Sequence, residues 1–163
     1  MQKRGYFLTL DAFVAVMLLV TGLLLIFSMQ SQKPYDTQAL YYSQDVMNSL
    51  SDTSVQEIND PYINALRQNG TVINSGNSLI QQIGEFYVNN DMSTASSFSQ
   101  AAITSINSQY GFRVVVNNYV IYNTSIPPND TNVVSASKTI VYGTVNKTRL
   151  WGPYIAEVTT WQR

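Results

Sequence analysis

The sequence contains neither cysteine nor histidine among its 163 residues. Without cysteine the chain has no disulfide bonds and no thiolate nucleophile, and without both residues it lacks the usual ligands of zinc. The lack of histidine also removes the commonest general base near neutral pH and makes a Ser-His-Asp triad impossible. We therefore expect no catalytic residue, no metal and no cofactor, and we predict that the protein is not an enzyme.

Charged residues are scarce as well. They make up 12% of the chain, about half of their usual share in soluble domains, and the net charge is −1. A nucleic-acid-binding surface needs a concentration of basic residues, so we predict no nucleic-acid binding. Uncharged polar residues, among them 15 asparagines, must supply the surface, a composition that is frequent on exported and polymerising proteins.

Two weak signals of chemistry remain. The acids Asp52, Glu57 and Asp60 lie close together but lack the alternating D-x-D-x-D-G pattern of a calcium loop, so we interpret them as ordinary capping and solvated groups at a helix end. Lys138 follows Ser135 and Ser137, which leaves a Ser-Lys pair conceivable, but the surrounding strand pattern favours an ordinary solvated face.

A long apolar segment stands out against this polar background. Residues 12–32 carry no charge, and as a helix they would span about 32 Å, close to a bilayer core of roughly 30 Å. Lys3 and Arg4 precede the segment, so the positive-inside tendency predicts a cytoplasmic N-terminus and places residues 34–163 outside. A secretory signal peptide has a shorter apolar core, of about 7–15 residues, whereas a plain signal anchor fits the length.

The residues Lys3, Arg4 and Gly5, followed by Tyr6-Phe7-Leu8 and the apolar run, resemble the leader of type IV pilin-like proteins, particularly the archaeal class. The resemblance covers about residues 1–30. It implies that residues 1–5 are a leader, which a membrane prepilin peptidase removes by cutting between Gly5 and Tyr6. It also implies that the apolar helix becomes the core of a helical homopolymer, built with an assembly ATPase and a platform protein.

The resemblance implies that the apolar helix mediates assembly. Asp11 is unusual in this helix because it is charged. After cleavage Asp11 would be the sixth residue, whereas many bacterial pilins have an acid at the fifth place, here Leu10. Asp11 either pairs with a cation of a neighbouring subunit, or lies at the membrane interface, where the helix dipole favours an acid. The predicted assembly residues are Phe7, Leu10, Asp11, Phe13, Leu18, Gly22 and Leu25.

The rest of the chain predicts an α+β domain. Apolar spacing indicates a helix over residues 37–51, which would continue the apolar helix, and short helices over 77–89 and 93–109. Asp60-Pro61 and Asn69-Gly70 read as turns. Residues 112–161 predict an antiparallel meander of about four strands, with a tight turn at Asn117-Asn118. We expect three segments: the leader (1–5), an apolar helix continuing into the head (6–51), and an exported head (52–163).

Two surface features complete the prediction. Candidate N-glycosylation sites are Asn69, Asn123, Asn129 and Asn146, each followed by Ser or Thr two residues later. Tyrosines and Trp161 concentrate in the predicted strands, either because strands favour aromatic residues or because they form a contact or adhesive face.

The sequence thus predicts a subunit of an extracellular type IV pilus-like filament that is inserted in the membrane as a precursor. Two alternatives remain open. One is a signal-anchored surface protein whose ectodomain binds a ligand or partner. The other is a minor pilin or a pseudopilin of a secretion system.

Overall fold

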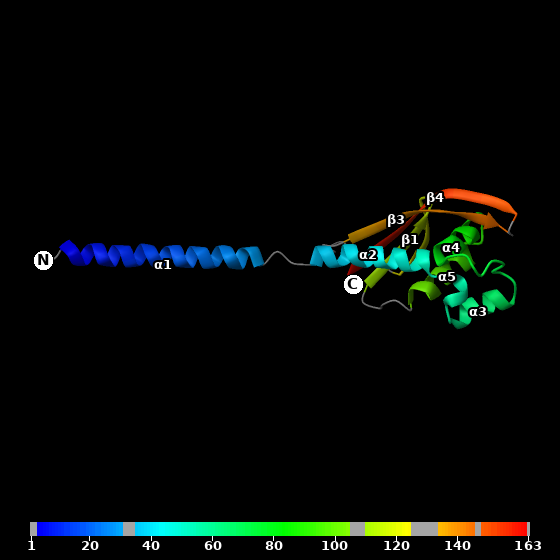
Figure 1. Ribbon diagram of the computed structural model, residues 1–163, viewed down its shortest axis with the longest axis horizontal. Coiled ribbons are helices and arrows are strands. Elements are labelled where there is room, and N and C mark those ends of the chain that lie inside the picture. Colours follow the sequence, from blue (N-terminus) through cyan, green and yellow to red (C-terminus); the bar gives the residue numbers. More distant parts are fainter. Residues whose placement is uncertain (1–2, 31–34, 105–109, 125–133, 146–147, 163) are drawn as a thin grey trace. The chain divides into compact units, whose positions relative to one another are not determined.

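The computed structural model describes residues 3–30, 35–104, 110–124, 134–145 and 148–162 (Figure 1). The chain divides into two compact units, Met1–Pro34 and Tyr35–Arg163, and we call the second unit the head. The first unit contains a single helix, α1 (Lys3–Gln30). No proline interrupts this segment, which is rich in leucine, valine and phenylalanine, so the helix runs without a break.

The head begins with α2 (Tyr35–Asp52), followed by the short 3-10 helix η1 (Val55–Glu57) and by α3 (Pro61–Gln68), α4 (Leu79–Val88) and α5 (Met92–Thr104). The predicted helices over 37–51 and 77–89 are confirmed with boundary shifts of one or two residues. The helix predicted over 93–109 is present up to Thr104, and residues 105–109 lie outside the described part of the chain.

The helix α3 corrects our interpretation of Asp60-Pro61 as a turn. Asp60 is the N-cap of α3, and its Oδ1 accepts hydrogen bonds from the backbone N–H groups of Tyr62 at 2.8 Å and Ile63 at 3.1 Å. Pro61 occupies the first helical position, where no N–H donor is needed. Gly70 follows the helix with a φ of 80°, so Asn69-Gly70 ends a helix and does not form the predicted hairpin turn.

The head closes with four strands, β1 (Tyr110–Val116), β2 (Tyr119–Asn123), β3 (Val134–Val145) and β4 (Arg149–Gln162). All neighbouring pairs are antiparallel, which confirms the α+β class with a C-terminal four-stranded sheet. The turn between β1 and β2 contains Asn117 and Asn118, both with positive φ, as predicted.

The strand order is β2-β1-β4-β3, so the predicted meander is wrong. In a meander β4 would lie at an edge, but here residues 156–162 of β4 pair with the whole of β1, and β4 separates β1 from β3. The burial of the strands explains this order. Ala156, Val158 and Thr160 of β4 are fully buried, so this strand is best covered at the centre of the sheet.

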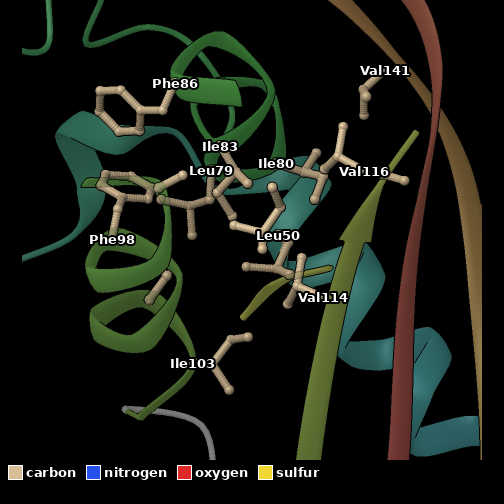
Figure 2. Close-up of a cluster of buried hydrophobic side chains, with 14 of the residues drawn as sticks. Leu50, Leu79, Ile80, Ile83, Phe86, Phe98, Ile103, Val114, Val116 and Val141 are labelled. Carbon is tan, nitrogen blue, oxygen red and sulfur yellow. The ribbon is translucent and has the colours of Figure 1, made fainter. Parts of the chain in front are cut away.

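The helices cover one face of the sheet and enclose the core with it (Figure 2). Leu50 of α2, Ile80 and Ile83 of α4, and Val114 and Val116 of β1 meet there and are almost completely buried. The rings of Phe86 and Phe98 pack edge to face between α4 and α5, with centroids 5.5 Å apart. We call the opposite face of the sheet the outer face.

Candidate assembly surface

The helix α1 exposes apolar side chains around its circumference. All described side chains from Leu10 to Ser28 are exposed, and only Gly22 is half-buried. This stretch has a mean hydropathy of 2.6, and none of it is buried within the protein. By length and composition α1 can therefore cross a membrane. A helix that is apolar on all sides suits lipid, and it suits a bundle of similar helices equally well.

The hydroxyl groups in this stretch have partners inside the helix. The Thr21 hydroxyl donates to the carbonyl oxygens of Met17 and Leu18, and the Ser28 hydroxyl donates to the carbonyl oxygen of Leu25 at 2.9 Å. Such bonds spare an apolar environment from unsatisfied polar groups. Among the residues from Leu10 to Ser28, this leaves the carboxylate of Asp11 as the polar group that the surroundings of the helix must accommodate.

The geometry of α1 sorts the predicted assembly residues into faces. Successive residues of an α-helix are rotated by about 100°, so Leu18 and Gly22 each lie about 20° from Asp11, and Leu25 lies about 40° from it. Leu10 and Phe13 point elsewhere, at about 100° and 160° from Asp11. The helix therefore places Asp11, Leu18, Gly22 and Leu25 on one face, which we call the Asp11 face.

Gly22 leaves a gap between the side chains of the Asp11 face, because glycine has no side chain. A Cβ placed at Gly22 would meet no other atom within 4 Å, so its lack of a side chain serves no contact within the described residues of this chain. Small residues allow a second helix to approach closely. The predicted leader residues Lys3, Arg4, Gly5 and Tyr6, together with Phe7, belong to the first turns of α1, and side chains are described from Leu10 onward.

Two of the four candidate glycosylation sites lie among the described residues. Asn69 and Thr71 are both exposed in the turn after α3, and the Asn69 side chain accepts a hydrogen bond from the Thr71 amide at 3.0 Å. Asn123 is exposed at the end of the edge strand β2. Asn129 and Asn146 lie outside the described residues. Asn69 is thus the candidate whose complete Asn-x-Thr motif is displayed on the surface.

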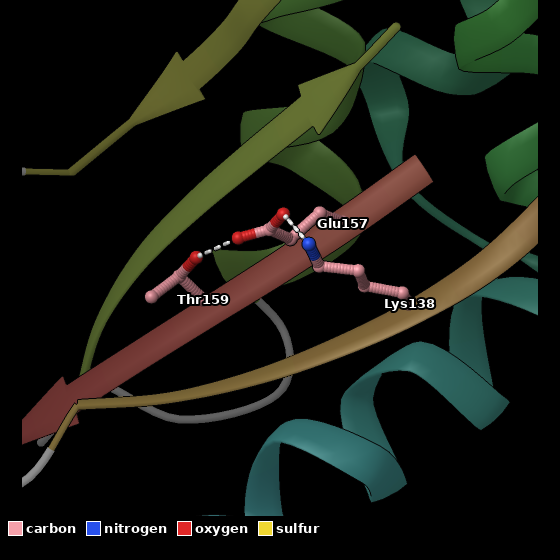
Figure 3. Close-up of polar contacts among 3 residues, drawn as sticks. All are labelled: Lys138, Glu157 and Thr159. Carbon is pink, nitrogen blue, oxygen red and sulfur yellow. Dashed lines mark hydrogen bonds and ion pairs between the residues drawn. The ribbon is translucent and has the colours of Figure 1, made fainter. Parts of the chain in front are cut away.

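The residues of the conceivable Ser-Lys pair are engaged elsewhere. The Lys138 ammonium lies 3.0 Å from Glu157 Oε2 across the β3–β4 pair, and Thr159 donates to the other oxygen of the same carboxylate (Figure 3). Ser135 lies on the helix-covered face, where its buried hydroxyl is 3.0 Å from that of Ser43. Lys138 and Ser135 therefore lie on opposite faces of the sheet. Lys138 lies on the exposed outer face, in agreement with the interpretation of a solvated strand face.

Two of the three acids near the end of α2 are capping groups, and the third, Asp52, is exposed. Glu57 Oε2 accepts a hydrogen bond from the Ser54 amide at 2.8 Å, and Asp60 caps α3 as described above. Among the described residues, no group of three or more acids is arranged to hold a metal ion.

The aromatic residues of the strands divide between core and surface. Tyr110, Tyr122 and Tyr154 pack against the core and Trp161 is buried, whereas Tyr119 and Tyr142 are exposed. Three exposed aliphatic residues of the same outer face, Ile140, Leu150 and Ile155, were not predicted as surface residues. The uninterrupted apolar stretch Ile140-Val141-Tyr142 was the available signal, because alternate residues of a strand point to opposite faces.

Comparisons of the chain with protein-family models, with curated proteins and with solved structures find no match. We therefore infer the function of the chain from the residues and contacts described above.

Proposed function

We propose that this chain is the structural subunit of an extracellular filament of the type IV pilus kind, similar to the archaeal class. One combination carries the proposal: the sequence Lys3-Arg4-Gly5 stands at the start of α1, and the apolar side chains of this helix are exposed on all sides from Leu10 to Ser28. A helix in a soluble core would be buried, and a plain membrane anchor has no need of a glycine after the basic pair.

The proposed mechanism uses α1 twice. As a precursor, the subunit keeps α1 in the membrane with the N-terminus in the cytoplasm and the head outside. After cleavage between Gly5 and Tyr6, transfer into the filament replaces lipid contacts with contacts between like helices. The Asp11 face supports close approach, because it combines a glycine with a carboxylate that can pair with a neighbour's cation. A prepilin peptidase, an assembly ATPase and a platform protein are the partners that this mechanism requires.

The test is mass spectrometry of the subunit in filaments sheared from the cell surface, combined with electron microscopy of the same preparation. We expect filaments composed of this chain with Tyr6 as the first residue. Replacing Gly5 by leucine should leave an uncut precursor in the membrane fraction, whereas Gly22→Leu, an equally bulky change within the helix, should still be cut. A membrane-bound chain that retains Met1 or Gln2 and forms no filaments would instead indicate a signal-anchored ectodomain.

A further inference from the structure

Four large side chains form an exposed apolar strip on the outer face of the sheet. They belong to the hairpin of β3 and β4, and their exposed fractions are 66% for Ile140, 63% for Tyr142, 80% for Leu150 and 55% for Ile155. We call this set the hairpin strip. Single exposed apolar residues are ordinary on protein surfaces, but contiguous groups mark sites of interaction.

The strand register places the four side chains on one face of the hairpin, with a register shift between Val141 and Gly143. Ile140 is the direct cross-strand partner of Ile155, and Tyr142 follows Ile140 two residues later on the same face of β3. The intervening residue Val141 is buried in the core on the other face. Leu150 precedes Trp151, which points into the core, so Leu150 points outward and extends the strip towards the end of the hairpin.

The strip lies at an edge of the sheet. β3 pairs with β4 on one side, and no strand within the described residues pairs with its other side. A long edge strand with an apolar face is a surface that proteins normally cover or break up with charge. The nearest charges on this face, Lys138 and Glu157, neutralise each other at 3.0 Å. The strip is therefore bordered by a pair of no net charge.

We propose that the hairpin strip is the surface through which the head contacts the head of a second copy of this chain. The proposal rests on the proposed function, because it places the contact between neighbouring subunits of the filament. It adds a head-to-head contact to the packing of α1, with Ile140, Tyr142, Leu150 and Ile155 as the residues that are covered.

The charge of the molecule favours a second copy as the occupant. Residues 35–163 contain six basic and nine acidic residues, so the head carries a net charge of −3, and identical heads repel each other only weakly. Recognition of a foreign protein usually relies on complementary charges for partner choice, and the strip presents an already neutralised pair. Copies held side by side by α1 would also meet at a high effective concentration, so a small apolar strip is sufficient for contact.

The absence of native cysteine permits a direct test. An Ile140→Cys variant of the full chain carries a single thiol, which is labelled with a benzophenone maleimide and irradiated in intact filaments. We expect cross-linked products at multiples of the subunit mass, with the linked peptide located in another head. The matched control is Tyr62→Cys, an exposed site on α3, which should give at least fivefold less of this product. Cross-links from residue 140 to lipid or to a different polypeptide would overturn the proposal.

A second experiment compares Ile140→Lys with Val120→Lys in the full chain. Val120 is an exposed residue of the outer face on the opposite edge strand, and it is paired with Val115. We expect Ile140→Lys to lower the yield of sheared filaments at least fivefold and Val120→Lys to leave it within twofold of wild type. Circular dichroism in detergent should show the same fold for both variants.

The possible outcomes distinguish a failure of the hairpin-strip contact from a failure of the proposed filament function. Equal yields for Ile140→Lys and wild type, or equal losses for both lysine variants, would overturn the hairpin strip as a contact while the filament proposal stands. A wild-type chain that forms no filaments would refute the proposed function itself.

Discussion

Gly111 and Trp161 face each other across the central strands β1 and β4. Trp161 is buried on the outer face, and a Cβ added to Gly111 would overlap the Cε2 and Nε1 atoms of its indole ring. The ring therefore occupies the space that a side chain at position 111 would fill. Aromatic side chains often cover a cross-strand glycine in this way and so fix the register of the pair.

This contact predicts the effect of a single methyl group. Gly111→Ala should destabilise the head by about 1–3 kcal/mol, because the indole must move out of its packed position. The measurement is thermal unfolding of the full chain in detergent, followed by circular dichroism. Gly76→Ala is the control, since a Cβ there makes only an ordinary contact of 3.4 Å with Asn74 Oδ1. Unchanged melting of Gly111→Ala would show that the indole is not confined.

Asp11 allows a prediction that separates its two interpretations. If its carboxylate pairs with a cation in the assembled filament, Asp11→Ala leaves that cation buried and unpaired, at a cost of about 3–5 kcal/mol where the site is dry. Filament yield should then fall while the membrane pool of subunit is preserved. The measurement is the ratio of sheared filament to membrane-retained subunit, with Asp52→Ala, an exposed acid of the head, as the control.

The other interpretation gives a different result for the same variant. An acid that only interacts with the helix dipole at the membrane interface contributes less than about 1 kcal/mol. The filament ratio of Asp11→Ala would then equal that of wild type, and assembly would depend on apolar packing alone.

At the scale of elements, α5 begins with a charged cap. Asp91 Oδ1 accepts hydrogen bonds from the Thr94 amide and the Ser93 hydroxyl, both at 3.2 Å. The hydrogen bond with the Thr94 side chain lowers the pKa of Asp91, and it is the largest influence on this pKa. Burial raises this pKa, but further bonds from the Thr94 amide and Ser93 lower it again, so the net pKa lies below its usual value of 3.8.

The lowered pKa of Asp91 predicts a specific pH dependence. Because the folded head favours the ionised carboxylate, this stabilisation is complete above the pKa of the unfolded chain and is lost as the pH falls through the folded pKa. Asp91→Asn retains a good N-cap but has no charge to lose. We therefore expect the melting temperature of wild type to fall more steeply below about pH 4 than that of Asp91→Asn.

The comparison needs a control for capping itself. Asp91→Ala removes the cap and should cost about 1 kcal/mol near neutral pH, which Asp91→Asn should not. Parallel melting curves of wild type and Asp91→Asn from pH 7 to pH 2 would contradict a stabilising role of the charge.

The helices and turns that depend on neighbouring residues could be predicted from the sequence, whereas the order of the strands could not. Local signals predicted α2, α4 and the Asn117-Asn118 turn, because capping, helical periodicity and positive φ depend on neighbouring residues. Asp60-Pro61 was misread because aspartate followed by proline starts both turns and helices. The strand order was missed because pairing of β4 with β1 joins segments about forty residues apart, which no local pattern encodes.

The candidate surfaces differ in the same way. The division of the assembly residues into an Asp11 face and other faces follows from helical periodicity, so it was available from the sequence. For the hairpin strip the sequence offers only the apolar stretch Ile140-Val141-Tyr142, because strand alternation indicates two faces but does not say which one the helices cover. Only the observed packing of α2 and α4 against β3 and β4 identifies Ile140 and Ile155 as exposed.

At the scale of the whole molecule, the two units have opposite surface chemistry. From Leu10 to Ser28, α1 exposes apolar side chains around one carboxylate, whereas the head buries most of its large aliphatic and aromatic side chains in one core. In the proposed filament, the first unit therefore carries membrane insertion and polymerisation. The hairpin strip supplements it and is too small to replace it.

This division predicts the behaviour of residues 35–163 without α1. We expect the fragment to be soluble and monomeric at micromolar concentration, because the long apolar helix α1, which could cross a membrane, is gone. The four side chains of the hairpin strip are far fewer than the roughly 20–30 residues that each partner contributes to a stable interface. Static light scattering gives the mass, and the full chain in detergent is the reference for the fold by circular dichroism.

Filaments of the fragment alone would move the assembly determinant from α1 to the head. A tight dimer that Ile140→Lys dissociates would instead show that the strip is stronger than its size implies, with polymerisation still dependent on α1.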